Sequence, residues 1–232
     1  MEAGPEYFLR ELRKVSAALA EPVTVYLFGG GVMALRGFKG QTKDLDMVVR
    51  GGKAAHDLIG GFEGAGYYRR RKLTPTYRNL HASAVLDNLS GFRIDLFVDV
   101  ICRALDYSER MQARATTFDL GPGKMDLRLA ALEDVFVLKS VTDRPRDVDD
   151  MALIAEKGLD WAAIQREMIA QRRTGNKFFM PIFIQSLEEL VERHQVAVPI
   201  LPKMLEEVED DLDEIEALNE KAKREHAERA KR

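Results

Sequence analysis

Apolar positions in the first half of the chain follow two different spacings. Residues 6–20 carry apolar side chains three and four positions apart, which predicts a helix with one buried face. Residues 23–28 form an apolar, β-branched run that stops at three successive glycines, and residues 44–49 alternate at first and then become wholly apolar. Both runs have the length and composition of buried strands.

More elements are expected before residue 130, and together they suggest one layered domain. They are, in chain order, a short helix at 32–35, a helix over 53–66, two strands over 82–86 and 92–98 that are joined by a turn at 88–91, and a hairpin between 115 and 129 with its turn at 121–123. We therefore expect an α+β fold in which a mixed β-sheet is flanked by helices.

The character of the chain changes near residue 131, after which the pattern is mainly helical. The predicted helices are those over 132–141 and 147–157, a third that Asp160 N-caps, and a fourth over 181–194. From Lys203 onward apolar residues recur at spacings of three and four and then give way to basic charge. We predict an α/β core over residues 1–130, a helical region over 131–202, and a long amphipathic helix over 203–232 whose last turns project into water.

Composition narrows the class of protein. The chain has 232 residues, of which 46% are hydrophobic and 31% charged, as in soluble globular proteins. It has neither an apolar run of about eighteen residues, which a membrane span needs, nor the apolar segment of a signal peptide. Its single cysteine, Cys102, excludes an internal disulfide and a Cys-based zinc site, so a cytoplasmic protein without a membrane partner is expected.

Charge gives no general attraction to nucleic acid, because the formal net charge is −3. A nucleic-acid partner would need a local basic patch.

Three successive glycines follow the first predicted strand. Gly29, Gly30 and Gly31 stand where a strand meets a helix, and without Cβ atoms their backbone N–H groups are open to a phosphate. A tight strand-to-helix turn explains the same glycines without any ligand.

Two carboxylates stand at the head of the next strand. Asp44 and Asp46 are two positions apart, so both side chains point to one face. They repel each other unless a cation lies between them, and oxygen-only ligands suit Mg²⁺ or Mn²⁺. A solvated strand end is the plain alternative.

A third carboxylate, Asp95, lies within an otherwise apolar strand, where a lone Asp is costly to bury. If its strand lies beside that of Asp44 and Asp46, the three can hold two divalent ions. Asp87 and Asp99 compete for the third position, but they border a turn and a strand end, where carboxylates need no metal.

These residues occur in an order that resembles a known family. Phe28-Gly29-Gly30, then Asp44-x-Asp46, then Asp95 is similar to the nucleotidyltransferase fold of the DNA polymerase β superfamily. The later segment is similar to AbiEii-type nucleotidyltransferases, many of them toxins of toxin–antitoxin pairs; its matching residues are Lys139, Arg144, Arg146, Asp147 and Asp150. The resemblance covers about residues 23–155.

The resemblance implies a metal-dependent enzyme that transfers a nucleoside monophosphate from an NTP to a hydroxyl group. Asp44, Asp46 and Asp95 would bind Mg²⁺ or Mn²⁺, and Asp95 could also accept the proton of the attacking hydroxyl. Lys139, in the helical region that completes the site, would neutralise triphosphate charge. The residues that would bind the nucleotide are Gly29, Gly30, Gly31, Lys139, Arg144, Arg146, Asp147 and Asp150. A surface lattice of salt bridges is the plain alternative for the last four.

Two positions depart from the family's pattern. Gly31 stands where many relatives have Ser or Thr, and Arg146 stands where a lysine is usual. Neither departure removes a metal ligand.

Acceptor and partners follow from the resemblance alone. It favours RNA, particularly a tRNA end, over a protein side chain, and it suggests a cognate antitoxin protein as partner. The C-terminal helix could pair two copies of the chain. A catalytically weak or inactive module that senses nucleotide or binds a partner, and an antibiotic-modifying enzyme, are the alternatives.

Overall fold

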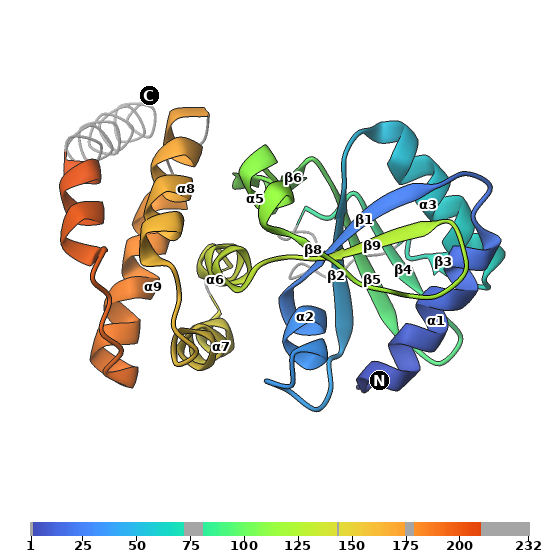
Figure 1. Ribbon diagram of the computed structural model, residues 1–232, viewed down its shortest axis with the longest axis horizontal. Helices are drawn as coiled ribbons and strands as arrows, with labels where there is room; N and C mark the ends of the chain where they lie inside the picture. Colours follow the sequence, from blue (N-terminus) through green and yellow to red (C-terminus); the bar gives the residue numbers. More distant parts are fainter. Residues whose placement is uncertain (1, 72–80, 143, 175–178, 210–232) are drawn as a thin grey trace, which may run out of the picture.

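The computed structural model describes residues 2–71, 81–142, 144–174 and 179–209. A mixed β-sheet with helices against it forms one side of the molecule, and a group of helices forms the other side (Figure 1). The predicted α+β class, with a helical C-terminal part, is confirmed. The division into three regions at residues 130 and 202 stays a prediction.

Helices occur along the whole described part of the chain. They are α1 (Pro5–Ala18), α2 (Gly29–Leu35), α3 (Gly52–Gly64), α5 (Glu109–Arg114), α6 (Leu132–Ser140), α7 (Pro145–Ala155), α8 (Trp161–Thr174) and α9 (Phe179–His194). Residues 201–209 are also helical. Among the described helices, none combines the length and apolar character that a membrane crossing needs.

The described strands join into one sheet. They are β1 (Val23–Phe28), β2 (Asp44–Val49), β3 (Tyr68–Arg69), β4 (Ala84–Asp87), β5 (Arg93–Val98), β6 (Val100–Ile101), β7 (Leu105–Asp106), β8 (Thr116–Thr117) and β9 (Met125–Leu129). Their order is β3-β4-β5-β2-β1-β9-β8, with β6 and β7 continuing from β5. The pairs β2–β5 and β1–β9 are parallel, and the other pairs are antiparallel.

Hydrophobic burial fixes the position of the central strands. Leu45 and Met47 of β2 and Ile94 and Leu96 of β5 are fully buried, and they share the face of the sheet opposite to the one that carries Asp44, Asp46 and Asp95. Helices α1 and α3 pack against each other, and α3 also contacts β1 and β5. On the other side α2 contacts α6, so the sheet and the helical part share one hydrophobic core.

Most predicted elements are present with shifted ends. Helix α2 begins at Gly29, three residues before the predicted start, and α7 begins at Pro145, because proline is well tolerated in the first helical turn. Asp160 caps α8 by accepting a hydrogen bond from the Ala163 N–H (2.9 Å). Helix α5 and the two-residue strands β3, β6 and β7 were not predicted. The predicted projecting turns of the C-terminal helix, and with them its pairing, lie over residues 210–232, outside the described residues.

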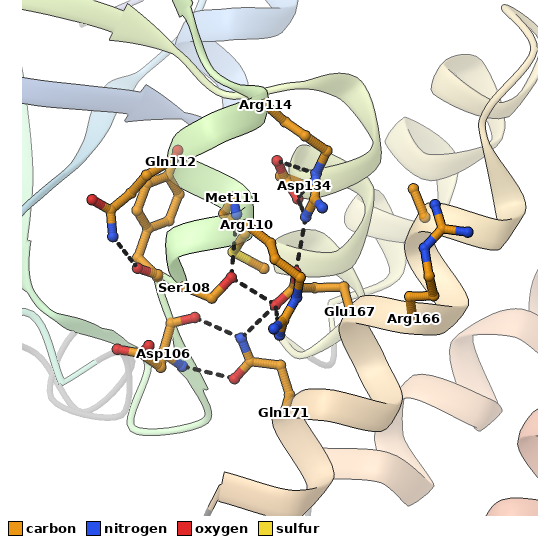
Figure 2. A network of polar contacts seen from close by, with 12 residues as sticks. Asp106, Ser108, Arg110, Met111, Gln112, Arg114, Asp134, Arg166, Glu167 and Gln171 are labelled. Atoms are coloured by element: carbon orange, nitrogen blue, oxygen red, sulfur yellow. Dashed lines mark hydrogen bonds and ion pairs between the residues drawn. The ribbon is translucent and has the colours of Figure 1, made fainter.

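A buried carboxylate joins the helical part to the sheet (Figure 2). Glu167 of α8 has no exposed surface. It accepts hydrogen bonds from Ser108 Oγ (2.8 Å), Arg110 Nε (3.0 Å), Arg114 Nη2 (2.9 Å) and Gln171 Nε2 (2.9 Å). Although burial raises the pKa of Glu167, these donors lower it below its ordinary value, so the carboxylate stays charged.

Arg114 continues this network into the next helix. Its Nη2 lies 2.6 Å from Asp134 Oδ1 on α6, where Asp134 is fully buried. Burial raises the pKa of Asp134 to about 6, although Arg114 opposes the shift. Three segments distant in sequence are therefore held in one orientation by paired charges.

Candidate functional site

An open cavity of about 200 Å³ lies between the sheet and helices α6 and α7. It is at the end of β1 and the start of β2 and β5. The predicted site residues that line it are Gly29, Gly30, Asp44, Asp46, Asp95, Lys139, Arg144, Arg146, Asp147 and Asp150. Residues up to 121 positions apart, from Gly29 to Asp150, thus meet in one place.

At two of the three glycine positions, neighbouring side chains lie so close to the backbone that a Cβ atom would clash with them. Gly29 has φ +63°, and a Cβ there would lie 2.3 Å from Asp46 Oδ2. A Cβ at Gly30 would lie 2.6 Å from Thr42 Oγ1. A side chain at either position would therefore displace groups that line the cavity.

Gly31 does not line the cavity. It is buried, and a Cβ there would lie 2.6 Å from Leu45 Cδ2 and 3.3 Å from the Leu27 side chain. A side chain at this position points into the core. The absence of Ser or Thr here is thus explained by packing against Leu45.

The three predicted aspartates lie on one face of two neighbouring strands. Asp46 pairs with Asp95 across the parallel strands β2 and β5, and Asp44 pairs with Arg93. Residues opposite each other, and those two positions apart, point to the same face. Asp95 is buried, with 1% of its surface exposed, whereas Asp44 and Asp46 are partly buried.

Arg93 was not predicted as part of this group, yet it joins two of its members. It forms ion pairs with Asp44 and with Asp95, whose Oδ1 lies 3.0 Å from Arg93 Nε. Within the described residues, no three His, Cys, Asp or Glu side chains are arranged to hold a metal ion. Arg93 therefore pairs with two of the three carboxylates that were predicted to bind a metal ion.

The two opposed carboxylates have raised pKa values. Burial and then the charge of Asp95 raise the pKa of Asp46 to about 7. Burial also raises the pKa of Asp95, although Arg93 opposes it. Asp46 forms no hydrogen bond or ion pair with any described residue. Since the two groups titrate together, the pair holds a proton more readily than two isolated carboxylates do.

Buried charges form the opposite wall of the cavity. Lys139 Nζ lies 2.8 Å from Asp147 Oδ1 and 2.5 Å from Asp150 Oδ2, and all three residues are buried. Lys39 also pairs with Asp150, and Thr142 Oγ1 donates to Asp147 Oδ2 (2.5 Å). This is not the surface lattice considered above.

These contacts keep Lys139 and Asp147 ionised. Burial lowers the pKa of Lys139, but the two carboxylates outweigh it and raise the pKa. Burial raises the pKa of Asp147, and Lys139 outweighs it.

Two arginines add positive charge at the edge of the cavity. Arg144 is partly exposed and Arg146 exposed, and neither forms an ion pair within the described part of the chain. Lys43, which was not predicted either, lines the cavity and lies 3.6 Å from Glu2. The cavity thus combines an acidic floor with cationic groups that an anion can reach.

The two alternatives to Asp95 have other partners and do not line the cavity. Asp87 is buried, and its Oδ2 lies 2.6 Å from Arg70 Nε. Asp99 accepts a hydrogen bond from the Gly51 N–H (3.0 Å) and pairs with Arg50.

Neither a family model nor a curated protein matches the sequence. Among solved structures, the chain is similar to JHP933 from Helicobacter pylori, with 12% identity over 93% of this chain and 97% of that chain and a TM-score of 0.42. It is similar also to an H. pylori protein named a putative nucleotidyltransferase, with 12% identity over 91% of this chain and 97% of that chain and a TM-score of 0.41. Values this low assign no activity to the chain.

Proposed function

We propose that this chain is a nucleotidyltransferase that binds an NTP in the cavity and transfers its nucleoside monophosphate to a hydroxyl group. The observation that carries the proposal is the placement of Asp44, Asp46 and Asp95 on one face of adjacent strands, beside the Gly29-Gly30 turn. Such an acidic face suits the reacting phosphate end of a nucleotide only if positive charge accompanies it.

The residues of the cavity supply much of that charge. Arg144 and Arg146 are available to bind triphosphate oxygens, and the backbone at Gly29 and Gly30 can approach them closely. Lys139 is held by Asp147 and Asp150, so it contributes a fixed charge. The Asp46–Asp95 pair, with its raised pKa, is suited to accept the proton of the attacking hydroxyl near neutral pH.

The donor set also suits a hard divalent cation, Mg²⁺ or Mn²⁺. Asp44, Asp46 and Asp95 offer only carboxylate oxygens, and Asp46 has no competing partner among the described residues. When bound, such a cation supplies positive charge to the phosphates. Asp44 and Asp95 can serve it only if Arg93 releases them.

RNA, particularly a tRNA end, is the acceptor class that we favour. Arg69 and Arg71 are exposed at the edge of the sheet, where β3 pairs with β4 and β4 pairs with the strand of Asp95. Basic side chains two strands from the acidic face can contact a phosphate backbone. A toxin–antitoxin role with a cognate protein partner is part of the same proposal, and it predicts growth arrest on expression of the chain alone.

A nucleotide-binding module without turnover is the second candidate. The observation that favours it is Arg93, which neutralises two of the three carboxylates without a metal.

One labelling experiment separates the candidates. Purified protein is incubated with each α-³²P-labelled NTP, Mg²⁺ or Mn²⁺, and cell extract, and labelled RNA and protein are resolved. Asp46→Asn is compared with Asp126→Asn, whose carboxylate pairs with Arg128 and Thr24 outside the cavity. We expect the wild type and Asp126→Asn to label RNA and Asp46→Asn to label nothing. Nucleotide binding without any label supports the module, and equal labelling by Asp46→Asn contradicts the proposal.

A further inference from the structure

A row of alternating charges crosses three strands beside the cavity. Asp87 of β4 pairs with Arg93 of β5, which in turn pairs with Asp44 of β2. Because residues opposite each other share a face, Arg93 has one carboxylate on either side, and Asp95 lies two positions farther along its own strand. Arg93 is therefore surrounded by three carboxylates and is bound to two of them.

The third carboxylate has an unused acceptor. Oδ2 of Asp87 is bound by Arg70 (2.6 Å), but Oδ1 is buried and accepts no hydrogen bond within the described residues. Only 1% of Asp87 is exposed. A buried oxygen without a donor is costly, so a guanidinium that reached it would be stabilised there.

Arg93 and a divalent cation cannot share the same carboxylates. Both are positive, and both need the oxygens of Asp44 and Asp95. Without Arg93 or a cation, the carboxylates of Asp44, Asp46 and Asp95 would repel one another at a site that is partly shielded from water.

We propose that Arg93 is a built-in counter-ion with two positions. It binds Asp44 and Asp95 when no cation is present, and it turns to the free oxygen of Asp87 when a divalent cation takes them. This inference rests on the cation of the proposed function. The inference goes further in one respect. Asp87 does not contact the cation, but it affects the affinity for the cation because it accepts Arg93 when the cation binds.

A double-mutant cycle on Mn²⁺ binding tests the exchange. Mn²⁺ alone is titrated, without nucleotide, and free Mn²⁺ is measured by electron paramagnetic resonance. The chains are the wild type, Arg93→Gln, Asp87→Asn and the double variant. Lys43→Gln is the control, because it removes a positive charge that also lines the cavity but whose ion-pair partner among the described residues is Glu2. Circular dichroism verifies that each variant is folded.

We expect Arg93→Gln to bind Mn²⁺ about tenfold more tightly, because the cation no longer displaces a partly buried ion pair. Lys43→Gln should change the affinity about twofold or less. Asp87→Asn should weaken binding several-fold in the wild type and change it much less in the Arg93→Gln background, because Asp87 then acts on the cation only through its distant charge. Equal effects of Asp87→Asn in both backgrounds would indicate through-space charge alone and would overturn the inference.

Arginine side-chain NMR gives a second readout that does not depend on Arg93→Gln folding. Addition of Mg²⁺ should shift the Arg93 Nε–H resonance in the wild type and shift it much less in Asp87→Asn. Asp46→Asn separates the two proposals. Suppose that Asp46→Asn abolishes Mn²⁺ binding but Arg93→Gln does not bind Mn²⁺ more tightly than the wild type. The two-position role of Arg93 is then wrong, while the cation site of the proposed function stands. If Asp46→Asn binds Mn²⁺ as the wild type does, the proposed cation site fails as well.

Discussion

Asp46 of β2 lies opposite Asp95 of β5, and the two carboxylates share the floor of one cavity. This pairing of like charges is unfavourable in the free protein, as the raised pKa values of both groups indicate. It is the kind of local cost that proteins retain at functional sites.

Because the two charges repel each other in the free protein, we predict that Asp46→Asn stabilises the protein at alkaline pH. The pKa of Asp46 is about 7 in the folded chain, against 3.8 for an unperturbed group. The folded state thus binds the proton more tightly than the unfolded state, so wild-type stability falls as pH rises from about 4 through about 7. With EDTA present, the stability of Asp46→Asn relative to the wild type should be about 2–3 kcal/mol greater at pH 8 than at pH 5. Urea denaturation at both pH values measures this, and a variant that is less stable at pH 8 would contradict it.

Gly31→Ser should not create a phosphate ligand. The added Cβ would lie 2.6 Å from Leu45 Cδ2 in the core, so overpacking should destabilise the fold by about 1–3 kcal/mol. Gly60→Ser is the matched control, because Gly60 is an exposed residue of α3 with open space around its Cβ position. Calorimetry and nucleotide titration of both variants measure the two effects. Tighter nucleotide binding by Gly31→Ser would show that the hydroxyl does reach the cavity.

Cys102 should resist alkylation although it lines the cavity. Burial, and then the charge of Asp46, raise the pKa of its thiol from 9.0 to about 12. Because the thiolate is the reactive form, iodoacetamide at pH 7.5 should modify the folded chain about 10²–10³-fold more slowly than the urea-unfolded chain. Cys102 is the only cysteine, so mass spectrometry reports it without background. Similar rates in both states would argue against this environment.

Glu167→Gln should weaken the connection between the helical part and the sheet. The substitution leaves Arg110 and Arg114 without the buried carboxylate that they share in Figure 2. Because Arg110 is half exposed and Arg114 keeps its ion pair with Asp134, the loss should cost about 1–3 kcal/mol. Glu188→Gln, on an exposed position of α9, should change stability by about 0.5 kcal/mol or less. Equal denaturation midpoints for the two variants would mean that the network contributes little.

Much of the acidic face could be predicted from local pattern. The period of two along a strand placed Asp44 and Asp46 together, and the apolar flanks of Asp95 marked it as a buried charge in need of a partner. The spacing of Asp147 and Asp150 likewise put both on one face of a helix, where Lys139 binds them.

The rest depends on pairings that no local pattern contains. Arg93 is two residues before Asp95 and shares its face by the same period, but its contact with Asp44 follows only from the register of β2 against β5. Glu167 could not be predicted, because three of its four donors lie more than fifty positions away in the sequence. Gly31 does not line the cavity as its neighbours Gly29 and Gly30 do, because α2 directs its Cβ position toward Leu45.

Transfer of a nucleoside monophosphate by the face of Asp44, Asp46 and Asp95 is tested most directly by the release of pyrophosphate from NTP. The rate is measured with Mg²⁺ and total RNA for the wild type, Asp46→Asn and Asp126→Asn. We expect similar rates for the wild type and Asp126→Asn, and a rate at least about 10²-fold lower for Asp46→Asn. Release by Asp46→Asn at the wild-type rate would contradict the proposed chemistry.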